Sequence, residues 1–296
     1  MKCAIIVIVS TLALGGCGPK VKVIKRLPPS AIRPAQEATL DTLLERYRAW
    51  ADSIRTLNAT VQLFPTAGST YSGVIEQYHD IRAFILAERP AKLRLIGQAP
   101  LVHTNIFDMV TDGETFQISI PSKKKFIVGP NRLERVSKKP IENLRPGHLV
   151  EALLPSPVAE RSADSGLRTF PEEWDAPPYR YYVISLLREK PAGGEAGLEI
   201  QKKIWLDRAD LSVARIQSFA SGGRLVSDAT YADYAAFGEI NYPRSITLLR
   251  PRDDYTLVLQ VQKLIANQPL AAEKFELAQP PGSELVKLEA SKEASR

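Results

Sequence analysis

The residue types that most often carry catalysis are few and scattered in this sequence. Its three histidines, His79, His103 and His148, show no metal-ligand spacing and no accompanying cluster of cysteines or carboxylates. The chain has no Gly-x-Ser-x-Gly elbow, phosphate-binding loop or dinucleotide fingerprint. Ser122 and Lys125 have the Ser-x-x-Lys spacing, but that chemistry needs both residues on one helical turn, and here they follow a predicted strand. We therefore expect no enzymatic activity and no metal or cofactor.

The cysteines indicate a different chemistry, the attachment of a lipid. Cys3 lies in a signal-like segment, where a positive residue precedes an apolar run over 5–14 that is too short for a permanent membrane span. The run ends in Leu14-Gly15-Gly16-Cys17, which resembles the bacterial lipobox. Cleavage after residues 1–16 would leave a single cysteine, so no internal disulfide could form. We predict covalent lipid on Cys17, with an uncleaved anchor or a simple secretory signal as the alternatives.

The residues after this cysteine predict where the chain is held. Residue 18 is Gly, and in the sorting rule for enteric lipoproteins Asp at this position favours the inner membrane, so Gly18 predicts the outer membrane, facing the periplasm. Residues 17–39 predict a tether, because they are rich in proline and basic residues and lack an apolar period. The net charge of +6 is mild, and no dense basic stripe with aromatics is present, so we expect no nucleic acid partner.

A helix and two series of strands must position any site. Apolar residues recur at spacings of three and four from Leu40 to Leu57, which predicts an amphipathic helix with Thr39 as its N-cap and Asn58 as its stop. After Asn58 the apolar period changes to two, and turn signals divide the chain into short antiparallel strands. The predicted strands are 59–65, 72–79, 81–88, 91–98, 103–111, 115–120, 124–128, 179–189, 198–207, 212–220, 224–235, 243–250 and 254–266.

The segment between the two series has a different pattern. Residues 140–154 predict one or two short apolar helices, and the prolines of 155–178 predict an inserted loop or lid. The polar residues 283–296 predict a frayed tail after a domain that spans 40–282. These elements favour a mainly β protein, a strongly curved antiparallel sheet with helices on its concave face. A membrane-embedded barrel is the alternative, but the predicted strands lack a clean lipid-facing apolar band.

Several short motifs share the pattern of one known family. They are Arg82–Leu86, Pro90–Leu95 and Ala99–Leu101, the turn Asp112-Gly113 with Phe126–Gly129, and later Trp205–Asp207, Tyr242-Pro243 with Ile246, and Leu257–Leu259. Together they resemble the LolA/LolB superfamily, the carriers and receptors that move lipoproteins to the outer membrane. The resemblance covers roughly residues 40–282. It implies an unclosed antiparallel β-barrel of about a dozen strands, with a helical lid and an apolar cavity for acyl chains.

The resemblance also implies partners and one residue role. LolB is itself a lipoprotein, so Cys17 favours the LolB side, with acylated cargo delivered by a soluble LolA-like carrier. LolB exposes an apolar residue on a loop after a proline, which it uses to insert cargo into the membrane. Leu101, directly after Pro100, matches that position.

Alternation also groups the apolar side chains that could form the wall of such a cavity. Within each predicted strand they share one face, and they are Leu93, Leu95, Phe107, Met109, Phe116, Ile118, Leu257, Leu259 and Val261. An ordinary packed core is equally compatible with this pattern. We expect a monomeric, membrane-anchored lipoprotein that binds acyl chains and helps localise lipoproteins or other lipids to the outer membrane. The alternative is a structural envelope lipoprotein that binds a protein partner without carrier activity.

Overall fold

The computed structural model describes residues 33–69, 74–77, 81–99, 104–131, 146–158, 166–176, 178–190 and 197–288. Within them lie two α-helices, α1 (Leu40–Asp52) and α2 (Pro146–Leu153). The strands are β1 (Thr56–Ser69), β2 (Val74–Gln77), β3 (Ile81–Glu88), β4 (Lys92–Gln98), β5 (Asn105–Thr111), β6 (Thr115–Ile120), β7 (Lys125–Pro130), β8 (Leu167–Ala176), β9 (Tyr179–Glu189), β10 (Leu198–Asp207), β11 (Val213–Ala220), β12 (Arg224–Phe237), β13 (Ile240–Arg250), β14 (Tyr255–Ala266) and β15 (Glu284–Lys287). No helix in these ranges is long and apolar enough to cross a membrane.

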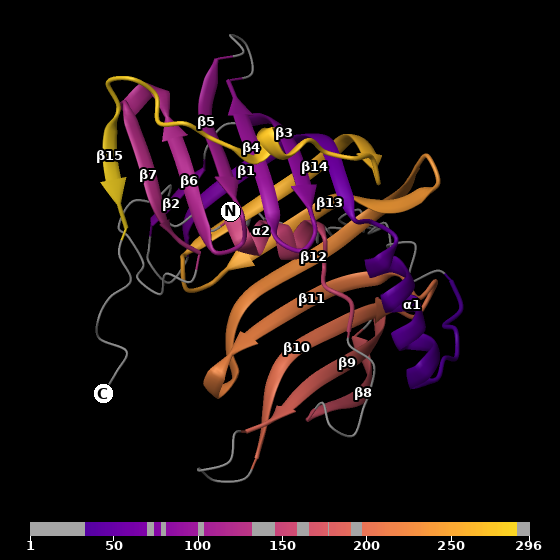
Figure 1. Cartoon of the computed structure of the whole chain (residues 1–296). Helices are drawn as coiled ribbons and strands as arrows, with labels where there is room; N and C mark the ends of the chain where they lie inside the picture. The colour runs from indigo at the N-terminus through magenta and orange to yellow at the C-terminus, as the bar shows by residue number, and fades with distance from the viewer. Residues whose placement is uncertain are drawn as a thin grey trace, which may run out of the picture.

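The strands form one large, unclosed and strongly curved sheet (Figure 1). Their order is β15-β7-β6-β5-β4-β3-β1-β14-β13-β12-β11-β10-β9-β8, with β2 paired to β1. Neighbours are antiparallel except for β15 beside β7. Within the described ranges, β15 and β8 are the two ends of this order and do not pair with each other. The predicted mainly β architecture with an unclosed antiparallel sheet is confirmed.

The inner face of the sheet holds the core because the strands alternate. Directly opposed residues on neighbouring strands share a face, and one such row crosses five strands through Ala59, Ile85, Leu95, Met109 and Ile118. None of the five is more than 2% exposed. Burying each large apolar side chain contributes about 1.5–3 kcal/mol. The period of two seen in the sequence therefore corresponds to a buried inner face.

Helix α1 confirms the predicted start but ends earlier than predicted. Thr39 caps it as expected, because its hydroxyl accepts from the Thr42 N–H at 3.3 Å. The helix ends at Asp52, where Ser53 caps it by donating its backbone N–H to the carbonyl of Ala49. The predicted stop at Asn58 is wrong, since Asn58 lies in β1 and pairs with Leu86. The apolar period in the sequence continues beyond Asp52 because Leu57, which lies in β1, is also buried in the core.

Two predicted irregular segments contain strands. Residues 155–178, predicted as a loop or lid, include β8 over Leu167–Ala176. A strand at the end of a sheet pairs on one side only, which is why it tolerates Pro171. The predicted frayed tail from residue 283 includes β15, which pairs in parallel with β7. The predicted helix within 140–154 is confirmed as α2.

Between β14 and β15, over residues 267–283, the chain crosses the outer side of the sheet (Figure 1). We call these residues the crossing segment. Arg94, which points outward from β4, donates from Nη1 to the Lys274 carbonyl at 3.1 Å. The Lys92 ammonium lies 5.7 Å from the centroid of the Phe275 ring. These contacts hold the crossing segment against β4 and bring its end to β7.

Candidate functional site

The nine predicted cavity residues lie together on the inner side of the sheet. They come from β4, β5, β6 and β14 and belong to one continuous apolar cluster: Leu93, Leu95, Phe107, Met109, Phe116, Ile118, Leu257, Leu259 and Val261. None is more than 6% exposed. The sequence therefore placed them on the correct face. Their role as acyl-chain contacts stays a prediction.

Helix α2 occupies the space that these residues enclose. It packs against β4, β5 and β13, and its buried side chains are Pro146, Leu149, Val150, Ala152 and Leu153. Figure 1 shows it between the upper and lower parts of the curved sheet. An eight-residue helix of this kind is apolar enough to fill a hollow and too short to be stable alone in water. In this structure the interior is filled by the helix.

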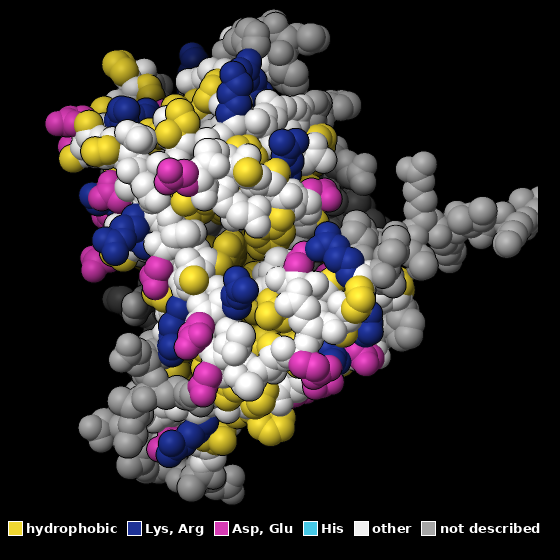
Figure 2. Space-filling model, turned by 90° about the vertical axis from the view of Figure 1, so that its right-hand side faces the viewer, with side chains coloured by type: hydrophobic (Ala, Val, Ile, Leu, Met, Phe, Trp, Pro, Cys, Tyr) yellow, Lys and Arg dark blue, Asp and Glu magenta, His cyan; other side chains and the backbone are white. Residues whose placement is uncertain are grey.

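A hollow is visible from the side of the molecule on which α1 lies. Figure 2 shows that hydrophobic side chains gather in the middle of this face, where the surface is hollowed. Charged side chains are spread around them. Apolar surface set back in this way suits an apolar ligand, because burial alone provides the free energy of binding.

Four side chains donate hydrogen bonds to carbonyl groups in the last turn of α2 and in the residues just after it. We name them the carbonyl clamp: Tyr47, Arg89, Tyr231 and Tyr242. Tyr231 donates to the Ala152 carbonyl at 3.1 Å, and Tyr242 donates to the Leu153 carbonyl at 2.8 Å. The last carbonyls of a helix have no partner within it, so they need donors from elsewhere. Tyr231 of β12 and Tyr242 of β13 provide these donors for the last turn of α2.

The other two members of the clamp fix the chain just after α2. Tyr47 of α1 donates to the Ser156 carbonyl at 2.8 Å. Arg89 donates to the Pro155 carbonyl at 2.7 Å and, through the same nitrogen, to the Ala51 carbonyl of α1 at 2.6 Å. Arg89 thereby links the ends of both helices.

The environment keeps the tyrosines of the clamp neutral. Burial raises the pKa of the hydroxyl of Tyr47, and the nearby Glu151 carboxylate raises it further. Burial raises the pKa of Tyr231 and Tyr242 in the same way. Their hydroxyls therefore remain protonated and can donate hydrogen bonds. One ion pair completes the attachment of α2, between Glu151 Oε1 and Lys202 Nζ of β10 at 2.5 Å.

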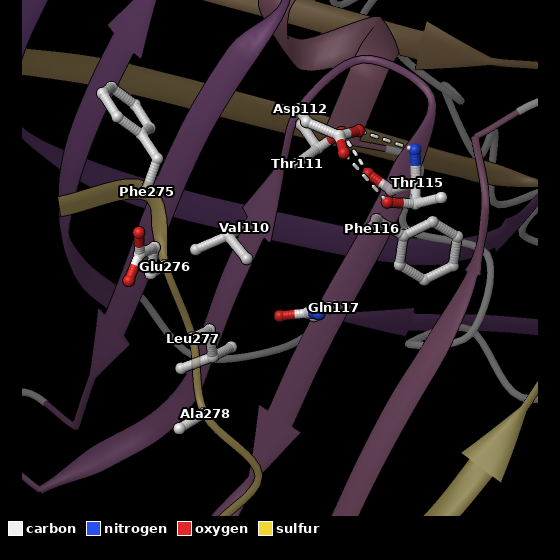
Figure 3. A pocket seen from close by; sticks show the side chains of 10 residues that line it. All are labelled: Val110, Thr111, Asp112, Thr115, Phe116, Gln117, Phe275, Glu276, Leu277 and Ala278. Atoms are coloured by element: carbon white, nitrogen blue, oxygen red, sulfur yellow. Dashed lines mark hydrogen bonds between the residues drawn. The ribbon is translucent and has the colours of Figure 1, made fainter. Parts of the chain in front are cut away.

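A separate pocket of about 350 Å³ lies on the outer side of the sheet. Figure 3 shows the side chains of Val110 and Gln117 on β5 and β6 beneath Leu277 of the crossing segment. At its end, Asp112 accepts the backbone N–H groups of Glu114 and Thr115, both at 2.8 Å, which fixes the predicted turn. Sequence reasoning missed this pocket because one wall comes from a segment with no periodic pattern.

Most of the other residues singled out from the sequence lie outside the described ranges. Cys17, Gly18 and Leu101 lie outside the described residues, as do His79 and His103. Ser122 lies in a short 3-10 helix, whereas Lys125 begins β7 and its ammonium is 3.8 Å from the Glu284 carboxylate. Ser122 and Lys125 are therefore not on one α-helical turn. No group of three or more potential metal ligands occurs in the part of the chain that the structure describes.

Comparisons with known proteins give fold-level similarity only. No protein-family model and no curated protein matches the chain. A LolA superfamily protein from Nitrosomonas europaea is similar in structure, with a TM-score of 0.48, 13% identity, and coverage of 81% of this chain and 99% of that one. A DUF1329 family protein from Desulfovibrio piger has a TM-score of 0.48 and 12% identity, over 79% of this chain and 94% of that one.

A third structure, a domain named for outer membrane lipoprotein sorting from Vibrio parahaemolyticus, has a TM-score of 0.41. It shares 11% identity, over 79% of this chain and 93% of that one. Likenesses this weak assign no activity to the chain.

Proposed function

We propose that this protein is a lipoprotein of the outer membrane that binds acyl chains inside its curved sheet. Lipid on Cys17 would hold it on the periplasmic side. Acylated cargo, brought by a soluble carrier of the LolA type, would enter the interior and then pass into the membrane past Leu101. The alternative is a structural lipoprotein that binds a protein partner and carries no lipid.

The observation that carries this proposal is the relation between α2 and the inner face. The buried side chains that the helix packs against the inner face are apolar, much as an acyl chain is, while Glu151 pairs with Lys202 of β10 and the carbonyls at one end are held by the carbonyl clamp. Displacing α2 would leave an apolar hollow lined by residues such as Leu95 and Met109. An acyl chain needs only such a dry space, since no polar group must be recognised along its length.

A photoreactive fatty acid tests this proposal without altering the protein. The purified chain is incubated with a diazirine-bearing fatty acid, irradiated and digested, and the labelled peptides are identified by mass spectrometry. Label on β4, β5, β14 or α2 is the expected result. Label confined to the outer pocket between β5, β6 and residues 275–278 would place the ligand elsewhere. No saturable labelling, with no lipid in an organic extract, would favour the structural alternative.

A matched pair of variants on β4 adds a second test. Leu95→Glu puts a charge into the interior, whereas Ile96→Glu puts it on the other face of the same strand. We expect weaker binding of a fluorescent fatty acid by the first variant only. Both melting temperatures are measured, and binding is compared only between folded preparations.

A further inference from the structure

A cluster of aromatic side chains lies on the outer face of the last strands of the sheet. Phe170 and Trp174 of β8 and Tyr179 of β9 are 58%, 45% and 42% exposed. Tyr181 of β9 and Trp205 of β10 lie beside them on the same face, because Trp174 is paired with Tyr181 and Trp205 with Val183. We name these five residues the aromatic face. They are on the side away from the acyl-binding interior and from α2.

Four of these rings contact one another. Trp174 lies 6.1 Å from Tyr181 and 5.3 Å from Trp205, measured between ring centroids. Tyr181 is 5.7 Å from Trp205 and 6.1 Å from Tyr179. Cross-strand aromatic pairs stabilise a sheet, yet stabilisation alone does not require that Trp174 and Phe170 be half exposed. Large apolar side chains gathered on a surface mark a contact with something else.

The charges on the aromatic face are compensated by neighbours. Arg215 stacks over the Trp205 ring at 5.3 Å and forms a bidentate ion pair with Asp228. Lys203 Nζ is 3.5 Å from the Glu172 carboxylate. Pairing lowers the cost of moving these charges out of bulk water, although it does not remove it. Tyrosine and tryptophan rings, each with an apolar body and a polar edge, are the side chains that prefer the boundary between lipid headgroups and acyl chains.

The end of the tether lies at the same end of β9 but on the inner face of the sheet, where the Tyr182 hydroxyl contacts the backbone of Gln36 and Ala38. Arg180, between Tyr179 and Tyr181 in sequence, donates to the Arg33 carbonyl at 2.9 Å. Arg33 also forms an ion pair with Asp210, in the turn that follows β10. Residues 18–32 separate Arg33 from Cys17. Fifteen residues span at most about 50 Å, so a lipid on Cys17 would keep this corner within that distance of the bilayer.

We propose that the aromatic face rests on the membrane to which Cys17 anchors the chain, with its rings at the level of the headgroups. This inference rests on the proposed lipid anchor and adds an orientation to it. The acyl-binding interior would then be held on the periplasmic side of a sheet whose opposite face contacts the bilayer. The occupant is a phospholipid surface, because the tether reaches the same edge of the sheet and the exposed rings are of the kind that prefers the headgroup level.

Tryptophan quenching in vesicles tests the orientation. The full lipidated protein is reconstituted into vesicles of phosphatidylethanolamine and phosphatidylglycerol that contain brominated acyl chains, which quench only nearby tryptophans. One variant carries Phe170→Ser, Trp174→Phe and Tyr179→Ser, so that Trp205 still reports on the face. Its matched control carries Leu198→Ser, Leu249→Ser and Ile265→Ser, which are 51%, 39% and 57% exposed at other places.

The expected result is strong quenching of the wild type and the control, and loss of most of the quenching in the aromatic variant. Protein that floats with vesicles but is not quenched would overturn the orientation and leave the anchor intact. Protein without lipid on Cys17 would overturn both. Unquenched protein retained by insoluble peptidoglycan would assign the rings to stacking on sugars and also refute the membrane contact. Fatty-acid uptake, measured in parallel, should be equal in both variants.

Discussion

Removing one hydroxyl from the carbonyl clamp should loosen α2 and tighten fatty-acid binding. Tyr242 is 1% exposed and donates to the Leu153 carbonyl at 2.8 Å. Tyr242→Phe keeps the ring and leaves that carbonyl without this partner. A buried group that loses its hydrogen bond costs about 1–3 kcal/mol. If the substitution destabilises only the closed state, in which α2 occupies the interior, the free-energy difference to the open state, in which α2 is displaced, falls by the same amount.

The effect on binding follows from that shift. When the binding-competent state is rare, the apparent dissociation constant is the intrinsic one divided by the fraction of that state. A loss of about 1–3 kcal/mol in the closed state therefore improves the apparent affinity roughly 5–150-fold. The protein would become less stable to heat and yet bind its ligand better.

The chain offers a matched control for this comparison. Tyr234→Phe removes a hydroxyl that donates to the Val213 carbonyl at 2.8 Å, and Val213 belongs to β11. Both substitutions should lower the melting temperature, but only Tyr242→Phe should tighten binding of a fluorescent fatty acid. Equal affinities in the two variants, at equal loss of stability, would refute the idea that α2 must move.

Three further predictions follow from the sequence and the site. Cys17→Ser should abolish incorporation of labelled palmitate and release the domain from the membrane fraction; unchanged fractionation of a wild type that takes up no label would contradict the lipid anchor. Leu101→Glu should leave the melting temperature and fatty-acid uptake nearly unchanged while slowing transfer into liposomes, and normal transfer would remove Leu101 from the mechanism. Burial raises the pKa of Tyr231, Tyr234 and Tyr242 above the unfolded value of about 10, so the stability they contribute is complete below that pH and falls as the pH rises above it. Melting temperatures between about pH 8 and 11 measure this decline, which should be smaller in Tyr242→Phe, and a flat profile would contradict the buried hydroxyls.

The strands could be predicted well because each is buried on one face. The predicted 81–88 and 115–120 coincide with β3 and β6, and 179–189 and 198–207 coincide with β9 and β10. Strand β1 is longer than the predicted 59–65. Pro65 lies between the residues that pair with β3, which end at Leu63, and those that pair with β2, which begin at Thr66. On this side of β1 the proline falls in the gap between two pairings, while on the other side it is paired with Leu257 of β14. Sequence alone does not reveal the gap.

The site could be predicted only in part, because alternation reports burial and not what fills the interior. The clamp tyrosines look like ordinary apolar positions of a helix and two strands. Their partners lie far away in sequence: Ser156 is 109 positions from Tyr47, and Leu153 is 89 positions from Tyr242. The aromatic face was missed for a related reason. Pro171 made β8 resemble a loop, so Phe170 and Trp174 were not recognised as strand residues that share a face with Tyr181.

The chemistry of the clamp suits the proposed displacement of α2 from the interior. Charged groups buried at the end of α2 would oppose the return of the helix to the interior, because they would have to be desolvated again each time. Three of the four clamp residues are instead neutral tyrosines, each of which donates one hydrogen bond that water can replace. The charged member, Arg89, also holds the Ala51 carbonyl of α1, so it can remain in place when Pro155 moves away. Arg89 would thus stay with α1, while release of α2 would exchange three neutral hydrogen bonds for water and break the partly exposed ion pair of Glu151 with Lys202.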